Sequence, residues 1–164
     1  MGQNSPMSES RERTDEGRAA ESTQAEGAAL APAELDERER LALHAASEKK
    51  AHDLVVLDLR EVASFTDYFV IASGTNVRQV QAIADAVQEQ LRKQLRVKPA
   101  RVEGYNSAEW VLLDYGDFIF HVFEEKSRRF YDLERLWRDA ARVPLPPDVA
   151  GVEDAGGGSL RDAR

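Results

Sequence analysis

The chain of 164 residues contains no cysteine, which excludes disulfide frameworks, thiolate zinc sites and cysteine nucleophiles. It also lacks a long apolar run, because the longest one extends only from Tyr68 to Ala72, whereas a membrane-spanning helix needs ~20 residues. The N-terminus has neither the basic segment nor the apolar segment of a signal peptide. These absences predict a soluble, cytoplasmic protein without a membrane partner.

An excess of positive charge is missing as well. The chain has 22 Lys and Arg residues against 30 Asp and Glu residues, which gives a formal net charge of −8. Residues 38–143 carry 17 basic and 17 acidic side chains, so the net charge lies on the two ends. A balanced central region is not the basic footprint of a protein that binds nucleic acid through phosphates alone.

Composition divides the chain into three regions. Residues 1–36 have almost no large apolar side chains, and such a segment cannot bury enough surface to offset roughly 1–2 kcal/mol per residue of backbone ordering. We therefore expect a disordered acidic extension over 1–36 and one folded domain over 37–143. Three prolines and a run of glycines predict a flexible tail over 144–164.

Hydrophobic periodicity predicts eight elements in the folded domain. In chain order they are a helix over 37–51, strands over 54–59 and 68–73, a helix that begins after Asn76, strands over 101–104, 110–115 and 117–123, and a helix capped by Ser127. A strand–helix–strand crossover implies parallel pairing, and a tight hairpin implies antiparallel pairing. The prediction is an α/β (α+β) fold, a mixed five-stranded sheet packed on about three helices in the order α-β-β-α-β-β-β-α.

Two of the helices carry specific signals. Asn76 and Gln79 fit a capping box, and the residues that follow place apolar side chains at steps of three and four, from Val80 to Leu95. In the last helix the same spacing predicts one buried stripe made of Phe130, Leu133, Trp137 and Ala140.

No arrangement of residues typical of catalysis is found. Asp114 and Asp117 are three residues apart, so their side chains diverge on a strand, whereas a two-metal site needs converging carboxylates. None of the three histidines, His44, His52 and His121, lies at a metal-ligand spacing from an acid or another histidine. We therefore predict no enzyme, no catalytic residue, no cofactor and no metal.

The strand over 110–115 is more informative, because both of its faces carry apolar groups. Trp110, Leu112 and Asp114 share one face, and on the next strand His121 is flanked by apolar neighbours. Pattern alone leaves two alternatives open. Either the first helix covers this face, or the face stays bare and forms a protein-contact site.

A basic cluster of Lys126, Arg128 and Arg129 follows two glutamates at the start of the last helix. Cations in a first helical turn oppose the helix dipole. Two alternatives remain here too, a partner phosphate or carboxylate, or a solvated face with local glutamate pairing.

Several blocks of the sequence resemble the ribosomal silencing factor family (RsfS, also called Iojap). The blocks extend over about residues 41–138 and agree with the family in order and spacing; they are Ser64 to Gly74, Glu103-Gly104, Trp110 to Asp117, His121 to Phe123 and Ser127 to Tyr131. The resemblance implies a nucleotidyltransferase-like fold without the catalytic acids.

The resemblance also implies a function. Family members bind the fourteenth protein of the large ribosomal subunit at the intersubunit face, block association with the small subunit and repress translation when nutrients are short. A peripheral contact with ribosomal RNA and a homodimer are further implied. The alternatives are a nucleotidyltransferase-like nucleotide-processing enzyme, a large-subunit assembly factor and an oligomeric structural module.

Carried over by position, the family's contact surface assigns partner-binding residues in this sequence. The main candidates are Trp110, Leu112, Asp114 and His121. The secondary candidates are Tyr115, Phe123, Phe65, Thr66, Asp67 and Tyr68.

Overall fold

A computed structural model describes residues 33–149 of the chain. The disorder predicted for residues 1–32 and the flexibility predicted for 150–164 therefore lie outside the described residues. Leu35 and Val149, which flank the domain limits of 37 and 143 proposed from the sequence, are both buried. Packing against the domain therefore continues beyond those two limits. Among the described helices, none has the length and apolar character needed to cross a membrane.

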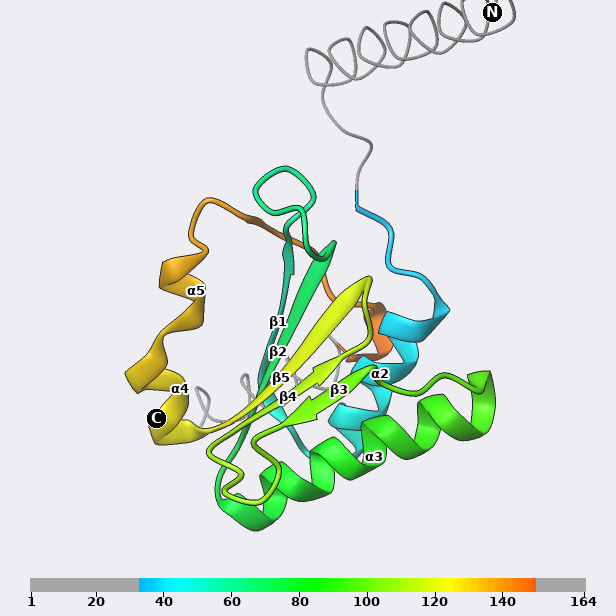
Figure 1. Cartoon of the computed structure of the whole chain (residues 1–164), viewed down its shortest axis with the longest axis vertical. Helices are drawn as coiled ribbons and strands as arrows, with labels where there is room; N and C mark the ends of the chain where they lie inside the picture. The colour runs from blue at the N-terminus through cyan, green and yellow to red at the C-terminus, as the bar shows by residue number, and fades with distance from the viewer. Residues whose placement is uncertain (1–32, 150–164) are drawn as a thin grey trace, which may run out of the picture. The chain divides into compact units, whose positions relative to one another are not determined.

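A mixed sheet in the order β3-β4-β5-β2-β1-β6 forms the centre of the domain (Figure 1). Its strands are β1 (His52–Asp58), β2 (Tyr68–Gly74), β3 (Arg101–Glu103), β4 (Trp110–Asp114), β5 (Phe118–Glu124) and β6 (Ala141–Arg142). β2 and β5 pair in parallel, and every other neighbouring pair is antiparallel.

The mixed α+β fold predicted from the sequence is confirmed, but the sheet has six strands and not five. The strand missed by the sequence analysis is β6, which pairs with β1 through Leu57 and Arg142. It has only two residues, both exposed, so it carries no period-two pattern that periodicity could detect.

Helices lie on both faces of the sheet (Figure 1). α2 (Glu37–Glu48) and α3 (Val77–Leu95) lie on one face, and α4 (Glu125–Tyr131) and α5 (Leu133–Leu136) lie on the other. α3 buries an apolar stripe that matches the predicted helical spacing, with Val80, Ile83, Val87 and Leu91 each inaccessible to solvent. α4 and α5 are short, so they cover much less of their face.

The start of α3 confirms half of the predicted capping box. The Asn76 side chain accepts a hydrogen bond from the Gln79 backbone N–H at 2.8 Å. The Gln79 side chain does not return the bond to Asn76; it accepts from the Thr75 backbone N–H at 2.6 Å and is also 2.8 Å from the Thr75 hydroxyl. The cap therefore extends one residue further toward the strand.

The single C-terminal helix predicted after Ser127 is wrong. Glu124 caps α4, since its side chain accepts from the backbone N–H groups of Lys126 and Ser127. The helix then breaks at Asp132, whose left-handed backbone (φ 49°, ψ 54°) reorients the chain before α5 begins.

This break also changes the predicted apolar stripe. Leu133 is buried, and Trp137 and Ala140 are half-buried against the sheet, as the spacing predicted. Phe130, two residues before the break, is 80% exposed, because an interrupted helix does not keep residues three apart on one face.

The start of α2 contains a buried acid. Asp36 caps the helix, and the Glu39 side chain accepts from the Asp36 backbone N–H at 2.9 Å, which completes a capping box. Glu39 is 2% exposed, and its burial, together with the nearby Asp36 carboxylate, raises its pKa to about 7. The pKa of this carboxyl group therefore lies near neutral pH, because ionising it costs more free energy in the native state than in the unfolded chain.

We expect Glu39→Gln to remove a pH dependence of stability. A raised carboxyl pKa means that the native state binds more protons than the unfolded state between pH 4.5 and about 7. The wild-type free energy of unfolding should therefore fall across this window as pH rises, by about 1–3 kcal/mol. Urea unfolding at pH 5 and pH 8 should show a smaller fall for Glu39→Gln than for the exposed control Glu37→Gln. Equal falls in the two variants would contradict the assignment.

Candidate functional site

The sheet presents two different faces. The face toward α2 and α3 holds the fully buried Val111, Leu113, Phe118, Phe120 and Val122. On the opposite face, Trp110, Leu112 and Asp114 of β4 pair with Phe123, His121 and Ile119 of β5. This alternation is the one predicted from the sequence. The half-buried side chains of β4 therefore lie on the face that carries the short helices α4 and α5.

Trp110 is held from two sides. Its indole stacks on Phe123, with ring centroids 4.9 Å apart and an interplanar angle of 28°. Its Nε1–H donates a hydrogen bond to Nδ1 of His121 at 3.0 Å. The Tyr131 ring lies 4.8 Å from the indole. The indole is consequently fixed in one orientation while part of its surface remains accessible.

His121 acts as a neutral hydrogen-bond acceptor. Its side chain is 2% exposed, and burial lowers the pKa of the ring to about 3. At neutral pH the ring is therefore uncharged, and since Nδ1 accepts from Trp110, the proton must lie on Nε2. Among the described residues, Nε2 has no hydrogen-bond partner. The imidazole packs against the ring of Phe69, which meets it edge-on with the two ring centroids 4.5 Å apart.

The row of aromatic side chains continues across the sheet. Trp137 contacts Phe69 at 5.6 Å and Phe65 at 5.9 Å between ring centroids. Phe65 comes from the loop between β1 and β2 and is 57% exposed. The loop and the segment after α5 thus meet over β2.

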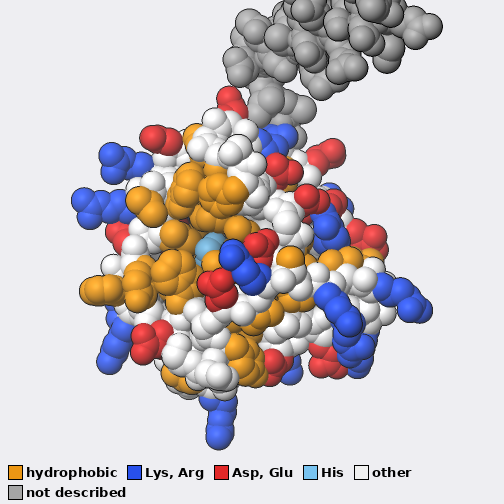
Figure 2. Space-filling model, viewed as in Figure 1, with side chains coloured by type: hydrophobic (Ala, Val, Ile, Leu, Met, Phe, Trp, Pro, Cys, Tyr) orange, Lys and Arg blue, Asp and Glu red, His pale blue; other side chains and the backbone are white. Residues whose placement is uncertain are grey.

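The exposed part of this row is a candidate contact surface, which we call the aromatic patch. Figure 2 shows hydrophobic side chains gathered at the surface on this side of the molecule, with charged side chains around them. An exposed aromatic surface with a charged rim is typical of a protein-contact site. The aromatic patch consists of Phe65, Trp110, Leu112, Tyr131 and Trp137.

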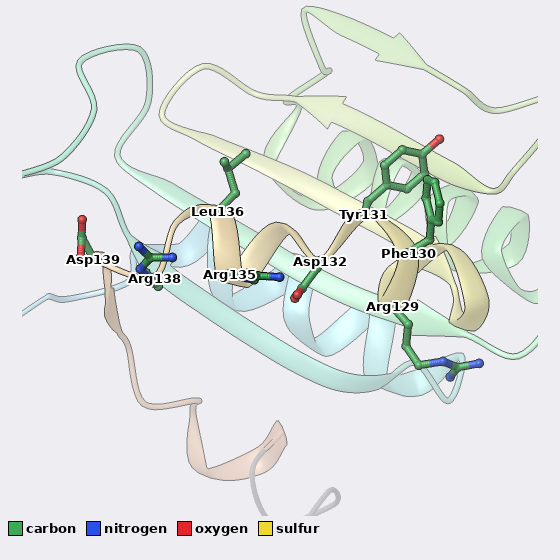
Figure 3. Close-up of a pocket in the computed structure, with 8 residues that line it drawn as sticks. All are labelled: Arg129, Phe130, Tyr131, Asp132, Arg135, Leu136, Arg138 and Asp139. Atoms are coloured by element: carbon green, nitrogen blue, oxygen red, sulfur yellow. The ribbon is translucent and has the colours of Figure 1, made fainter.

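A second exposed apolar group lies next to the aromatic patch, on α4 and α5. Phe130 and Leu136 are 80% and 74% exposed. Figure 3 shows both projecting to the same side of the segment as Tyr131, whereas Arg129 extends in another direction. The ring of Phe130 meets that of Tyr131 edge-on at 5.0 Å, so the two exposed groups are continuous.

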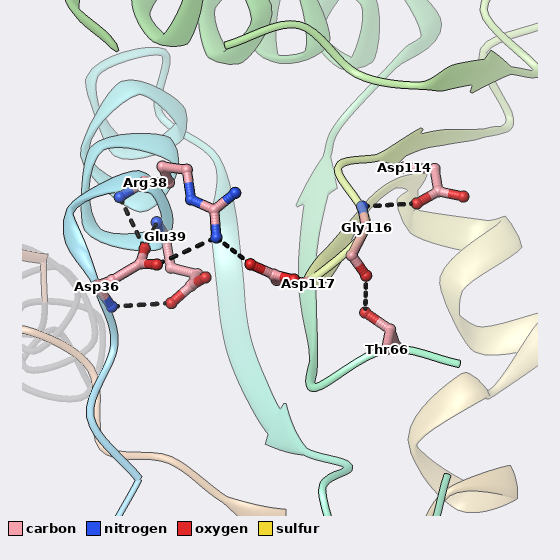
Figure 4. A network of polar contacts seen from close by, with 7 residues as sticks. All are labelled: Asp36, Arg38, Glu39, Thr66, Asp114, Gly116 and Asp117. Atoms are coloured by element: carbon pink, nitrogen blue, oxygen red, sulfur yellow. Dashed lines mark hydrogen bonds and ion pairs between the residues drawn. The ribbon is translucent and has the colours of Figure 1, made fainter. Parts of the chain in front are cut away.

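The acids near the turn between β4 and β5 are engaged by separate partners (Figure 4). Asp114 accepts from the Gly116 backbone N–H at 2.9 Å, and Asp117 forms an ion pair with Arg38 of α2. Thr66 donates from its hydroxyl to the Gly116 carbonyl at 2.8 Å. These contacts hold the turn in place. No group of three or more His, Asp or Glu side chains that could hold a metal occurs between residues 33 and 149.

Arg128 resolves one alternative left open by the sequence. Its guanidinium donates to both carboxylate oxygens of Glu134, at 3.1 and 3.0 Å, and to the hydroxyl of Ser73 at 2.8 Å. The hydrogen bonds from Arg128 lower the pKa of Glu134. Glutamate pairing therefore accounts for Arg128, but the pairing is with Glu134 at a buried position (9% exposed) and not on the solvated face that this alternative assumed. The pair attaches α4 and α5 to the end of β2.

Comparison with known proteins identifies the family. The model of the family described as "Ribosomal silencing factor during starvation" matches residues 32–160. The chain belongs to this family. The resemblance noted from the sequence blocks is thereby confirmed.

Individual silencing factors and their relatives are similar over most of the domain. The ribosomal silencing factor RsfS of Halalkalibacterium halodurans is 41% identical over 106 residues, covering 65% of this chain and 90% of that protein. A crystal structure of a protein from Chromobacterium violaceum has a TM-score of 0.61 and 36% identity, covering 70% of this chain and 91% of that one. The mouse protein named "Mitochondrial assembly of ribosomal large subunit protein 1" is 29% identical, and the match covers 65% of this chain and 52% of that protein.

The silencing-factor fold brings only some of the proposed contact residues to the surface. Trp110, Leu112 and Asp114 are half-buried on the bare sheet face, and Phe65 and Asp67 are exposed in the loop before β2. These five remain available to a partner.

The other five proposed contact residues are buried, so we no longer assign them a direct contact. His121 and Phe123 lie beneath Trp110 and support it. Thr66 and Tyr68 are 5% and 7% exposed. Tyr115 lies on the opposite sheet face, stacked on Phe118 at 4.9 Å, and burial raises its pKa to about 12.

The contribution of α4 and α5 to this surface was not predicted from the sequence. Tyr131 and Trp137 line the aromatic patch, and Phe130 and Leu136 extend it. A signal was present, because Phe130 and Tyr131 belong to one of the blocks shared with the silencing factors. Helical spacing instead placed Phe130 in the core, since it assumed an unbroken helix.

We expect His121→Gln to reduce the acid sensitivity of the domain. Because the native ring titrates near pH 3 and an unfolded histidine near 6.5, the unfolded state binds more protons between these values, and wild-type stability falls as pH decreases. The contribution should be roughly 2–4 kcal/mol between pH 7 and pH 4. Chemical unfolding at both pH values should show a smaller decrease for His121→Gln than for the surface control His44→Gln. A decrease as large as that of the wild type would contradict the buried, neutral histidine.

Proposed function

We propose that this silencing factor binds the large ribosomal subunit through its aromatic patch and thereby prevents association with the small subunit. The partner would be the fourteenth large-subunit protein at the intersubunit face, and the effect would be repression of translation in the cytoplasm under nutrient limitation. The observation that carries the proposal is the exposed aromatic patch on a sheet face that the protein's own helices leave partly bare.

The aromatic patch has the physical properties of a binding hot spot. Large aromatic side chains dominate interface energetics, and rigid ones lose little conformational entropy on binding. Trp110 is already fixed by Phe123 and His121, and Trp137 by Phe69. Binding would therefore bury apolar surface on a preorganised site.

Acidic groups at the edge of the aromatic patch would contribute specificity. Asp114 is half-buried, and Asp67 is exposed in the loop that carries Phe65. A partner with cationic groups at the matching positions would be favoured over one with acidic groups, and electrostatic attraction would speed association.

The proposed mechanism is steric. A folded domain docked on an intersubunit protein occupies volume that the small subunit needs. Mass action then lowers the fraction of large subunits able to join, and no covalent step is required. A homodimer formed through the same aromatic patch would compete with ribosome binding. Sedimentation velocity over a range of protein concentrations would reveal such a dimer.

A role in large-subunit assembly is the second candidate. It is favoured by the similarity to the mouse protein named for that process. Both functions require binding to the large subunit. They differ in when the protein binds, during assembly of the subunit or after it is complete. Depletion of the protein in cells would cause precursors of the large subunit to accumulate if assembly is the main role, and would change only subunit joining if silencing is.

We expect Trp110→Ala to weaken binding to isolated large subunits by about 2 kcal/mol or more, since it removes the most rigid part of the aromatic patch. Phe65→Ala, at a position that is 57% exposed, should weaken binding in the same direction. Cosedimentation with large subunits measures both, with Val77→Ala on α3 as an exposed apolar control. Unchanged cosedimentation of both folded variants would show that the aromatic patch is not the contact surface.

We also expect the full chain to reduce joining of purified subunits in proportion to the fraction of large subunits it occupies. Light scattering after mixing of large and small subunits measures joining, and folded Trp110→Ala serves as the matched control. Joining that proceeds normally with saturated large subunits would refute the steric mechanism. Calorimetric binding of a magnesium nucleotide would instead support the nucleotide-processing alternative.

A further inference from the structure

Beside the aromatic patch, α4, α5 and the turn after them form a shallow concavity of about 580 Å³. Phe130, Tyr131 and Leu136 provide its apolar part (Figure 3). Arg129, Arg135 and Arg138 follow the same segment and line the concavity too. We call this surface the arginine shelf, and its three arginines have no role in the contacts described so far.

The three arginines of the shelf are exposed, and none of them forms an ion pair with any of the residues described. Their neighbours differ in this respect. Arg128 and Arg142 both lie within 4 Å of the Glu134 carboxylate, at 3.0 and 3.8 Å. The acid available on α5 is therefore already shared by two other cations, and the shelf arginines keep their binding capacity.

The combination of free guanidinium groups and exposed aromatic rings indicates the class of partner. Arginine binds phosphate oxygens through two parallel hydrogen bonds, and exposed aromatic rings stack on unpaired bases without sequence preference. Phe130 is the most exposed large apolar side chain among the described residues. Residues 33–149 leave most of its surface uncovered, so it is available to a base.

We infer that the arginine shelf binds phosphates of ribosomal RNA next to the protein contact of the aromatic patch. This inference rests on the proposed function, because it requires docking on the large subunit. Tyr131 connects the two surfaces, with its ring 4.8 Å from Trp110 and 5.0 Å from Phe130. When a protein binds at Trp110, the RNA that lies next to that protein on the subunit is therefore brought close to the arginine shelf.

The predicted contact is small. Asp132 and Asp139 line the same concavity as the three arginines, so the local excess of positive charge is one. The shelf therefore suits one to three phosphates, not a continuous length of backbone. This agrees with the balanced charge of residues 38–143, which excludes a protein that binds nucleic acid by charge alone.

The test compares two triple variants of the full chain. The first replaces the shelf cations, Arg129→Ala, Arg135→Ala and Arg138→Ala. The matched control replaces three exposed arginines of α2 and α3, Arg40→Ala, Arg78→Ala and Arg92→Ala. Both remove three positive charges, so a nonspecific effect of net charge would be the same in the two variants.

Affinity for isolated large subunits is measured at several salt concentrations. We expect the shelf variant to bind at least about tenfold more weakly than the control at low salt, and the slope of log affinity against log salt to be less steep by roughly 2. Photo-crosslinking to large subunits that contain 4-thiouridine should also decrease in the shelf variant alone. Affinity for the purified fourteenth large-subunit protein should be unchanged in both variants.

Two results would overturn the inference. If the shelf variant and the control bind large subunits alike, with equal crosslinking, the shelf contacts no RNA. If the shelf variant loses affinity for the purified protein as well, the arginines face carboxylates of that protein. In both cases Trp110→Ala would still weaken binding if the proposed function holds. A wild-type chain that does not bind large subunits would instead refute the proposed function together with the inference.

Discussion

The hydrogen bond from the indole of Trp110 to a buried, neutral His121 is the interaction on which the candidate surface depends. A charged imidazole could not accept this bond, and burial in the sheet keeps the ring uncharged by lowering its pKa to about 3. The bond and the stack on Phe123 fix the indole so that one part is buried and another remains accessible. A rigid aromatic group at a surface is the kind of residue that protein interfaces use as an anchor.

The uneven cover of the sheet explains why such a surface exists. α2 and α3 together bury most of one face, whereas α4 and α5 are short and separated by the break at Asp132. The pair of Arg128 with Glu134 keeps these short helices attached, and it leaves their outer side bare. The bare apolar area costs hydration free energy in the isolated protein, and a partner that covers it would recover that free energy.

The aromatic patch and the arginine shelf differ in chemistry although they adjoin. The aromatic patch is rigid and mostly apolar, with acids at its edge. The shelf carries three cations without an ion-pair partner in the described part of the chain. A ribosomal subunit presents protein and RNA side by side, so a factor that binds its surface benefits from one site of each kind.

Periodicity and turn signals in the sequence were sufficient for the α+β class, the α3 helix, the hairpin of β4 and β5, and the face on which Trp110, Leu112 and Asp114 lie. These features depend on local spacing, which one stretch of chain contains in full. Tertiary structure decided the rest. Strand β6 pairs along the edge that β1 offers it, and α4 ends at the left-handed Asp132, beyond which Glu134 pairs with Arg128. Five of the proposed contact residues are buried, namely His121, Phe123, Tyr115, Thr66 and Tyr68, whereas Phe130, expected in the core, is exposed. Burial depends on which elements pack together, and a linear pattern does not contain that information.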